Sequence, residues 1–253
     1  MPPFDALPTD FAETGIAIHL KPATTLTRFQ VIGERASGTN LTNRLLGRNS
    51  PMKSSDVLGW KHGFPHAMAI PDDLVVVGLV RDATSWVRSL HAKPWHSTPD
   101  IQRLTFSEFL RTPWHSEIDR EDYFKNSGPL GVVGQTLQHD RHPLTGRPFE
   151  TVFDMRTAKL QALLSYFERN CNFILIRAEV VQADPMAATH ALLDALSFAR
   201  PDMFRGVHRR VGSKFKSRVG PRPPTPEILS QPDLEFLRAR LDCALERRLG
   251  YDY

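Results

Sequence analysis

The longest apolar run of the sequence is Leu74-Val75-Val76-Val77-Gly78-Leu79-Val80. Its length and its β-branched residues are typical of a strand that is buried on both faces of a parallel sheet. The residues that follow it, Ala83 to His91, have the pattern of a helix. Two further strands are expected at Thr27 to Ile32 and at Phe173 to Arg177. Strands that alternate with helices predict a three-layer α/β fold with a mostly parallel central sheet flanked by helices.

Five more segments have helical periodicity: Asn40 to Arg48, Phe106 to Arg111, Val152 to Arg169, Pro185 to Ala199 and Leu234 to Leu249. We expect one domain over residues 1–253, because the length suits a single large core. Residues 1–26 begin with weakly periodic Pro- and Thr-bearing sequence and are expected to form an N-terminal arm. Residues 98–150 are rich in Pro, Gly and His and are too long for a passive loop, so they predict a lid or a substrate-facing insertion.

The composition excludes several classes of protein. A content of 41% hydrophobic and 24% charged residues rules out wholesale disorder and a fibrous repeat. No apolar run approaches the roughly 20 residues that cross a bilayer, so we expect no membrane span. The first residues, Met1 to Asp5, lack the pattern of a secretion signal. The two cysteines, Cys171 and Cys243, fit a reducing compartment, and we expect a cytoplasmic protein.

Positive charge is concentrated in one segment. Between Arg200 and Arg222, eight Lys or Arg residues face one acid, Asp202, so this segment carries +7 although the whole chain carries only +4. Such a segment favours a polyanionic ligand bound at one place, and a solvated basic loop is the alternative. Nucleic-acid binding is not expected, because only Phe204 and Phe215 are interleaved with the basic residues.

A glycine-bearing loop follows the first expected strand and reads Gly33-Glu34-Arg35-Ala36-Ser37-Gly38-Thr39-Asn40. The spacing of its glycines is that of a P-loop, GxxxxGK[ST], with Thr39 in place of the lysine and Asn40 in place of Ser/Thr. A loop of this kind turns backbone N–H groups onto a phosphate at the positive end of a helix. Ser37, Thr39 and Asn40 add side-chain donors. The loop therefore predicts phosphate binding, and a plain strand-to-helix turn is the alternative.

A second anion site is expected where the longest strand ends. Arg81 follows the carboxyl end of that strand, and Ser89 lies eight residues later, about two helical turns along. A guanidinium group beside a hydroxyl suits a phosphate. The alternative is a surface pair of Arg81 with Asp82 and a serine that faces its own helix.

Together, these two motifs resemble those of the sulfotransferases that use 3′-phosphoadenosine 5′-phosphosulfate (PAPS), a family with a P-loop NTPase-like fold. The family's phosphosulfate loop has a core such as K-S-G-T-T, and its 3′-phosphate motif is R-N-P with a serine eight residues after the arginine. The resemblance implies PAPS as the sulfuryl donor. It places the nucleotide against Arg35, Ala36, Ser37, Gly38, Thr39, Asn40, Arg81 and Ser89.

Further segments resemble the same family and occur in the family's order. Residues 60–65 are similar to a K-T-H-L-P segment that carries the family's histidine base, and residues 177–185 to R-Y-E-D-L…D-P. Residues 209–214 resemble a basic R-K-G-x-x-G loop that closes over the nucleotide, and residues 245–251 the closing helix. The resemblance therefore adds Arg209, Gly212 and Lys214 to the nucleotide-binding residues.

The sequence departs from the family at several positions. Ala36 stands where the family has its loop lysine, and Arg35 lies one position earlier. When the prolines are aligned, the family histidine falls on Gly63, one position after His62. Ala178 stands where the family has the tyrosine that flanks the adenine.

The expected reaction is transfer of a sulfuryl group to a hydroxyl or an amine. We expect His62 to act as general base towards the acceptor, because histidine titrates near neutral pH. Arg35, Lys61 and the loop amides stabilise the departing phosphate, and no metal is expected. A structural histidine is the alternative role of His62. The acceptor, a small molecule or a glycan, is left open among sugar, lipid, phenol and peptide hydroxyls.

Two other functions stay open at this point. A P-loop kinase would use Asp82 as a magnesium anchor but must do without the lysine that Thr39 replaces. A non-catalytic nucleotide or polyanion binder is suggested by Ala36 and by the basic segment. The residues His91, Trp95 and His96 either face the acceptor or pack inside the protein.

Overall fold

The computed structural model describes residues 7–124, 126–208 and 214–253. They form two compact units whose segments alternate along the chain. Unit 1 comprises residues 7–82, 160–208 and 243–253, and unit 2 comprises residues 83–159, without residue 125, and 214–242. The expected insertion at 98–150 belongs entirely to unit 2. Among the described residues, no helix is both long enough and apolar enough to span a bilayer.

Unit 1 is built on a five-stranded sheet in the order β1-β5-β4-β2-β3. Four strands run parallel, and β1 pairs antiparallel with β5. The α/β fold with a mostly parallel sheet is thereby confirmed. The elements are α1 (Phe11–Thr14), β1 (Ile16–His19), β2 (Arg28–Gly33), α2 (Thr39–Asn49), β3 (Lys53–Ser54), β4 (Leu74–Val80), the end of α6 (Val152–Leu164), a 3-10 helix (Ser165–Glu168), β5 (Asn172–Arg177), α7 (Ala178–Ala183), α8 (Pro185–Ala195) and α10 (Cys243–Arg248).

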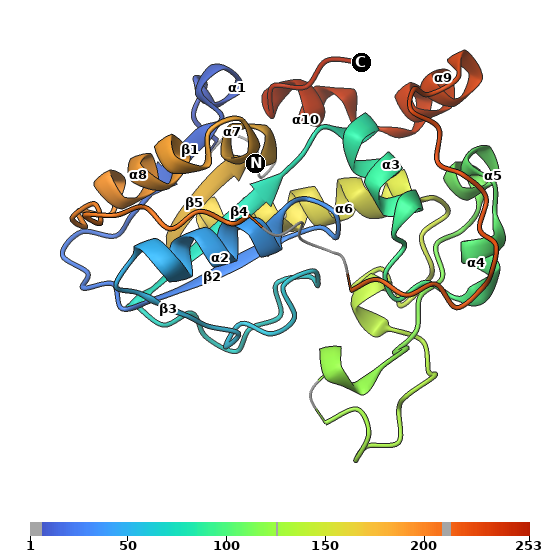
Figure 1. The fold of residues 1–253 in the computed structure, drawn as a ribbon, viewed down its shortest axis with the longest axis horizontal. Coiled ribbons are helices and arrows are strands. Elements are labelled where there is room, and N and C mark those ends of the chain that lie inside the picture. Colours follow the sequence, from blue (N-terminus) through green and yellow to red (C-terminus); the bar gives the residue numbers. More distant parts are fainter. Residues whose placement is uncertain (1–6, 125, 209–213) are drawn as a thin grey trace. The chain divides into compact units, whose positions relative to one another are not determined.

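The strands of unit 1 bury both faces of the sheet. Alternate residues of β4 enter two different apolar clusters, because successive side chains of a strand point to opposite faces. Val75, Val77 and Leu79 pack with residues of α2 and α8. Val76 and Val80 pack with the last turn of α6 and with α10. Figure 1 shows α2 and α8 in front of the sheet, and the last turn of α6 packs on the opposite face. A central sheet between two helical layers is compatible with the expected three-layer arrangement.

The carboxyl ends of three strands meet at one edge of this sheet. Gly33, the last residue of β2, pairs with Leu79 of β4, and Val80 of β4 pairs with Arg177 of β5. The register therefore places Arg81, the residue after Val80, beside the loop that leaves β2. In parallel sheets ligands bind at this edge.

Unit 2 is mainly helical. Its elements are α3 (Ala83–Ala92), α4 (Pro99–Arg103), α5 (Phe106–Arg111), 3-10 helices at Glu121–Tyr123 and Gln138–Asp140, the first turns of α6, and α9 (Gln231–Arg240). Aromatic side chains form its core: Trp114 meets Phe109 edge to face at 6.0 Å between ring centroids, and Trp86 lies 6.5 Å from Phe153. A buried carboxylate also holds the unit together, since Asp140 accepts hydrogen bonds from the side chains of Trp114, Ser116 and Lys159.

Three expected elements differ in the structure. Part of the expected N-terminal arm is ordered into α1 and β1, and β1 adds an edge strand along β5 from Ile16 to His19. The helix expected at Leu234 to Leu249 is wrong as one element: α9 ends at Arg240 because Leu241 is extended, and α10 starts anew in unit 1. The helix expected up to Ala199 ends at Ala195, and Ser197 has a left-handed backbone (φ 58°).

Candidate nucleotide site

The loop between β2 and α2 depends on glycine at two positions. Gly38 has φ 93°, a left-handed conformation in which glycine is favoured, and it forms the N-cap of α2. A Cβ atom on Gly33 would lie 2.7 Å from the carbonyl oxygen of Leu79, so any side chain there would collide with β4. Ala36 also has positive φ, 65°, although it carries a side chain. The two glycines that predicted a phosphate loop are therefore required by its shape.

The loop presents three successive backbone N–H groups at the start of α2. Ser37 is turned inward, because its N–H and its Oγ both donate to the Glu34 carbonyl, at 3.2 and 2.7 Å. The first helical bond runs from the Leu41 N–H to the Gly38 carbonyl at 2.9 Å. Between them, the N–H groups of Gly38, Thr39 and Asn40 have no acceptor within the part of the chain that the structure describes. Such donors, at the positive end of an 11-residue helix, suit an anion.

Arg81 contacts this loop. Its Nη1 donates to the Ala36 carbonyl at 2.7 Å, as the strand register leads one to expect. This bond also stabilises Ala36, one of the two loop residues with positive φ. The following residue, Asp82, donates its N–H to the Glu179 carboxylate at 2.9 Å and accepts a hydrogen bond from the Tyr253 hydroxyl at 3.2 Å. The end of β4 is thus held from three directions, and Arg81 is fixed beside the loop.

The segment that carries Lys61 and His62 lies against the same loop. The N–H of Gly33 donates to the Lys61 carbonyl at 3.0 Å, and His62 Nδ1 lies 2.6 Å from the Gly33 carbonyl oxygen. A carbonyl oxygen only accepts, so Nδ1 carries the proton, and Nε2 is the basic nitrogen of the neutral ring. Lys61 Nζ donates to Asn40 Oδ1. The loop, Lys61 and His62 therefore form one constellation.

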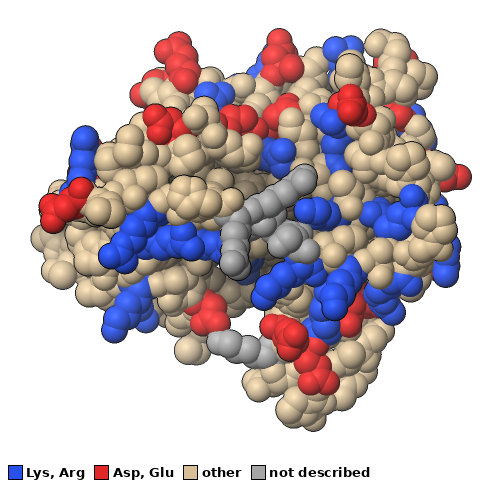
Figure 2. Space-filling model, in the orientation of Figure 1, with Lys and Arg blue, Asp and Glu red and all other residues tan. Residues whose placement is uncertain are grey.

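The electrostatic setting of Lys61 is unusual for a lysine. Burial and, secondly, the nearby charge of Arg44 lower the pKa of Lys61 to about 8. Arg44 was not among the expected site residues. It follows Asn40 by one helical turn on α2, so helical spacing alone would have predicted that the two share a helix face. α2 also carries Arg48, and Figure 2 shows Lys and Arg side chains gathered over the region that Figure 1 labels α2. This part of unit 1 is electropositive.

Arg35 is buried beside an indole ring. Only 5% of Arg35 is exposed, and its guanidinium carbon lies 5.3 Å from the centroid of the Trp60 ring, within the range of a cation–π contact. The same indole meets the His62 ring edge to face at 5.2 Å. Trp60, which was not among the expected site residues, therefore links Arg35 to His62.

The remaining expected nucleotide residues belong to unit 2 or lie outside the described residues. Ser89 lies on α3, and Lys214 is exposed; both belong to unit 2. Arg209 and Gly212 lie outside the described residues. Their expected roles stay predictions.

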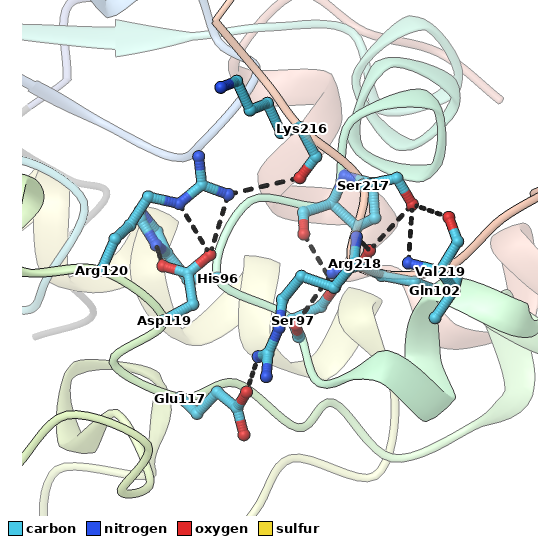
Figure 3. A network of polar contacts seen from close by, with 11 residues as sticks. His96, Ser97, Gln102, Glu117, Asp119, Arg120, Lys216, Ser217, Arg218 and Val219 are labelled. Atoms are coloured by element: carbon cyan, nitrogen blue, oxygen red, sulfur yellow. Dashed lines mark hydrogen bonds and ion pairs between the residues drawn. The ribbon is translucent and has the colours of Figure 1, made fainter.

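Three cations of the basic segment between Arg200 and Arg222 have internal partners, and the expected polyanion site stays a prediction. Arg200 forms an ion pair with Asp194 in unit 1. In unit 2, Arg218 forms an ion pair with Glu117 (Figure 3). Arg222 donates to the carbonyls of His91, Ala92 and Gln102 at 2.5, 2.8 and 3.2 Å. Among the described residues, the exposed cations of this segment that form no ion pair are Arg205, Lys214 and Lys216.

The histidines after α3 pack inside unit 2. His91 lies between the Thr225 hydroxyl at 2.7 Å and the Leu104 carbonyl at 3.2 Å, and burial lowers its pKa. His96 is 4% exposed, and its Nδ1 lies 2.6 Å from Asp119 Oδ1. Figure 3 shows the two side chains next to each other. The packing role of both residues is thereby favoured. In the described ranges, no group of three or more His, Cys, Asp or Glu residues has the geometry to hold a metal ion.

Comparisons with known proteins assign no family to this chain, so its function is inferred from these residues. No family model matches the chain, and no curated protein or solved structure matches it.

Proposed function

We propose that the chain is a sulfotransferase that transfers the sulfuryl group of PAPS to a hydroxyl or amine acceptor, on a P-loop NTPase-like fold. One observation carries the proposal: the N–H groups of Gly38, Thr39 and Asn40 open beside Arg81 at the carboxyl edge of a parallel sheet. The donor nucleotide has an anionic group at each end, and this edge offers a helix N-terminus and a guanidinium side by side.

The residues around the loop have separate roles in this proposal. The backbone N–H groups hold the 5′-phosphosulfate, and Arg81 contacts the 3′-phosphate. Lys61 and Arg35 supply positive charge to the oxygen that leaves with the nucleotide, a task that magnesium performs in many P-loop enzymes. The proposal therefore assigns the charge to side chains of this protein and needs no metal.

His62 is the general base of the proposed reaction. Its Nδ1–H donates to the Gly33 carbonyl, and this bond fixes both the tautomer and the orientation of the ring. Nε2 is then the nitrogen that takes the acceptor's proton as the new S–O or S–N bond forms. Because Gly33 also begins the phosphate loop, the base and the donor loop are held by the same residue.

The test is a transfer assay with PAPS labelled in its sulfuryl group, run in EDTA with sugar, lipid, phenol and peptide acceptors. We expect labelled product without added metal. The change His62→Gln should lower turnover by about 10²- to 10⁴-fold, while the affinity for adenosine 3′,5′-bisphosphate stays unchanged. His66→Gln is the matched control, since His66 lies in the same segment and is exposed.

Other results would select another function. Phosphoryl transfer from ATP that requires magnesium would identify a kinase that uses Asp82. Binding of the bisphosphate without transfer to any member of the panel would indicate a non-catalytic nucleotide binder. Full turnover of His62→Gln would remove His62 as the base.

A further inference from the structure

Unit 2 contains a cavity of about 280 Å³ that the nucleotide site does not use. Its size lies just below the range of about 300–1,000 Å³ in which small-molecule sites fall. Ile101 and Leu104, from α4 and its C-terminal end, supply an apolar wall. The rest of the lining is polar and comes from three chain segments: 98–100, 112–117 and 134–141.

Backbone pairing fixes the shape of this cavity. Ser97 bridges antiparallel to Ser116, and Glu117 bridges antiparallel to Thr136, so three extended segments lie next to one another. The middle segment is anchored from behind, because the Ser116 hydroxyl donates to the buried carboxylate of Asp140 at 2.6 Å. Glu117 is held by Arg218, whose own N–H donates to the Gln102 side chain at 2.9 Å (Figure 3). These contacts therefore fix the backbone segments that carry the polar side chains of the lining.

Both carboxylates of the lining have cationic partners. Asp100 forms an ion pair with Arg103 at 2.8 Å, and Glu117 forms one with Arg218. Their negative charges are compensated by these partners. The cavity therefore has no strong preference for a cation.

In contrast, four polar side chains of the lining have no hydrogen-bonding partner among the described residues. Thr98 is the N-cap of α4 but makes no capping bond through its hydroxyl. Among the described residues, the side chains of His115, Thr136 and Arg141 also have no hydrogen bond or ion pair. Arg141 is thus the one lining cation without a carboxylate partner in the described chain.

We propose that this cavity binds a small hydroxylated molecule that carries one carboxylate or phosphate group. The Arg141 guanidinium pairs with the acidic group, since its fork of N–H donors matches two oxygens. The hydroxyls of Thr98 and Thr136 and the His115 imidazole bind the hydroxyl groups of the ligand. The apolar wall of Ile101 and Leu104 suits the C–H face of a ring. This site requires no nucleotide, so the proposal is independent of the transferase function.

The test is calorimetric titration of the full chain with glucuronate, glucose 6-phosphate, glucose and acetate. We expect one or both of the acidic sugars to bind, and the tighter of the two identifies the acidic group. Glucose lacks the charge and acetate lacks the hydroxyls, so each should bind at least about tenfold more weakly. The change Arg141→Gln should weaken binding of the acidic sugar by about ten- to a hundredfold.

Two variants control this experiment. Arg147→Gln removes the same charge from an exposed position near Arg141 that does not line the cavity, and it should leave the affinity unchanged. Arg81→Ala should also leave it unchanged, because the phosphate loop is a separate site. Thermal unfolding verifies that each variant is folded. The proposal is overturned if neither acidic sugar binds saturably up to about 10 mM, if glucose binds as well as glucuronate, or if Arg141→Gln and Arg147→Gln have equal effects.

Discussion

Arginines donate to backbone carbonyls in two regions of this protein, beside the β2–α2 loop and in the segment at 214–222. Around the loop, Arg81 reaches the Ala36 carbonyl, and the N–H groups of Gly38 to Asn40 stand beside it without an acceptor among the described residues. In the other segment, the Arg222 guanidinium donates to three carbonyls, which include the last two of α3. Local charge alone does not separate the two regions.

The two regions differ in the backbone groups that surround the guanidinium: carbonyl acceptors around Arg222, and N–H donors beside Arg81. A guanidinium that caps carbonyl groups at the end of a helix satisfies backbone acceptors and complements the helix dipole, so it stabilises the fold. A guanidinium beside backbone N–H donors produces a concentration of positive charge that suits an anion. We therefore expect Arg222 to contribute to stability and propose that Arg81 contributes to binding, and each expectation can be tested.

The largest expected effect on stability is that of Arg222→Met. The substitution keeps much of the side-chain length but leaves the carbonyls of His91, Ala92 and Gln102 without this donor. We expect the free energy of unfolding to fall by about 2–4 kcal/mol, measured by urea denaturation. Lys216→Met is the matched control, because Lys216 is exposed in the same segment, and the change should stay within about 0.5 kcal/mol. Equal losses in the two variants would show that Arg222 is not an anchor.

A smaller effect is expected from the titration of Lys61. The pKa of this half-buried amine is about 8, so well below pH 8 the amine is charged and attracts an anion, whereas well above pH 8 it is neutral in the free protein. The dissociation constant of adenosine 3′,5′-bisphosphate should therefore rise by up to about tenfold from pH 8 to pH 9, as measured by calorimetry. Lys61→Arg keeps the charge over this range and should abolish the rise. A flat profile in the wild-type protein would separate Lys61 from the bound anion.

The sequence predicted the framework of unit 1 well because local and tertiary preferences agree there. β4, for example, is an apolar β-branched run that is buried on both faces. In unit 2, α5 (Phe106–Arg111) begins with a capping box at Thr105 and also has the expected bounds. The edge strand β1 was missed, since its four residues are short and gain their structure from pairing with β5. The break after Arg240 was missed because helical periodicity continues across it, although α9 and α10 belong to different units.

The candidate site was predictable where backbone geometry dictates the residue type. Gly33 and Gly38 identified the loop, and the strand register accounts for Arg81 beside it. Partners that come from tertiary packing were not predictable. The indole beside Arg35 belongs to Trp60, and the carbonyls that accept hydrogen bonds from Arg222 belong to residues far from it in the sequence. Charge density in a sequence counts cations but does not show which of them already have partners.

The most direct test of the central claim compares two nucleotides on Arg81→Ala. The two nucleotides, adenosine 3′,5′-bisphosphate and adenosine 5′-phosphate, differ only in the 3′-phosphate, which is the group that Arg81 is proposed to contact. We predict that the wild-type protein binds the bisphosphate more tightly, and that Arg81→Ala weakens the bisphosphate by about ten- to a hundredfold and the monophosphate by less than about threefold. Equal weakening of both nucleotides would mean that Arg81 only supports the loop through Ala36, and the account of a site for a doubly phosphorylated adenosine would be contradicted.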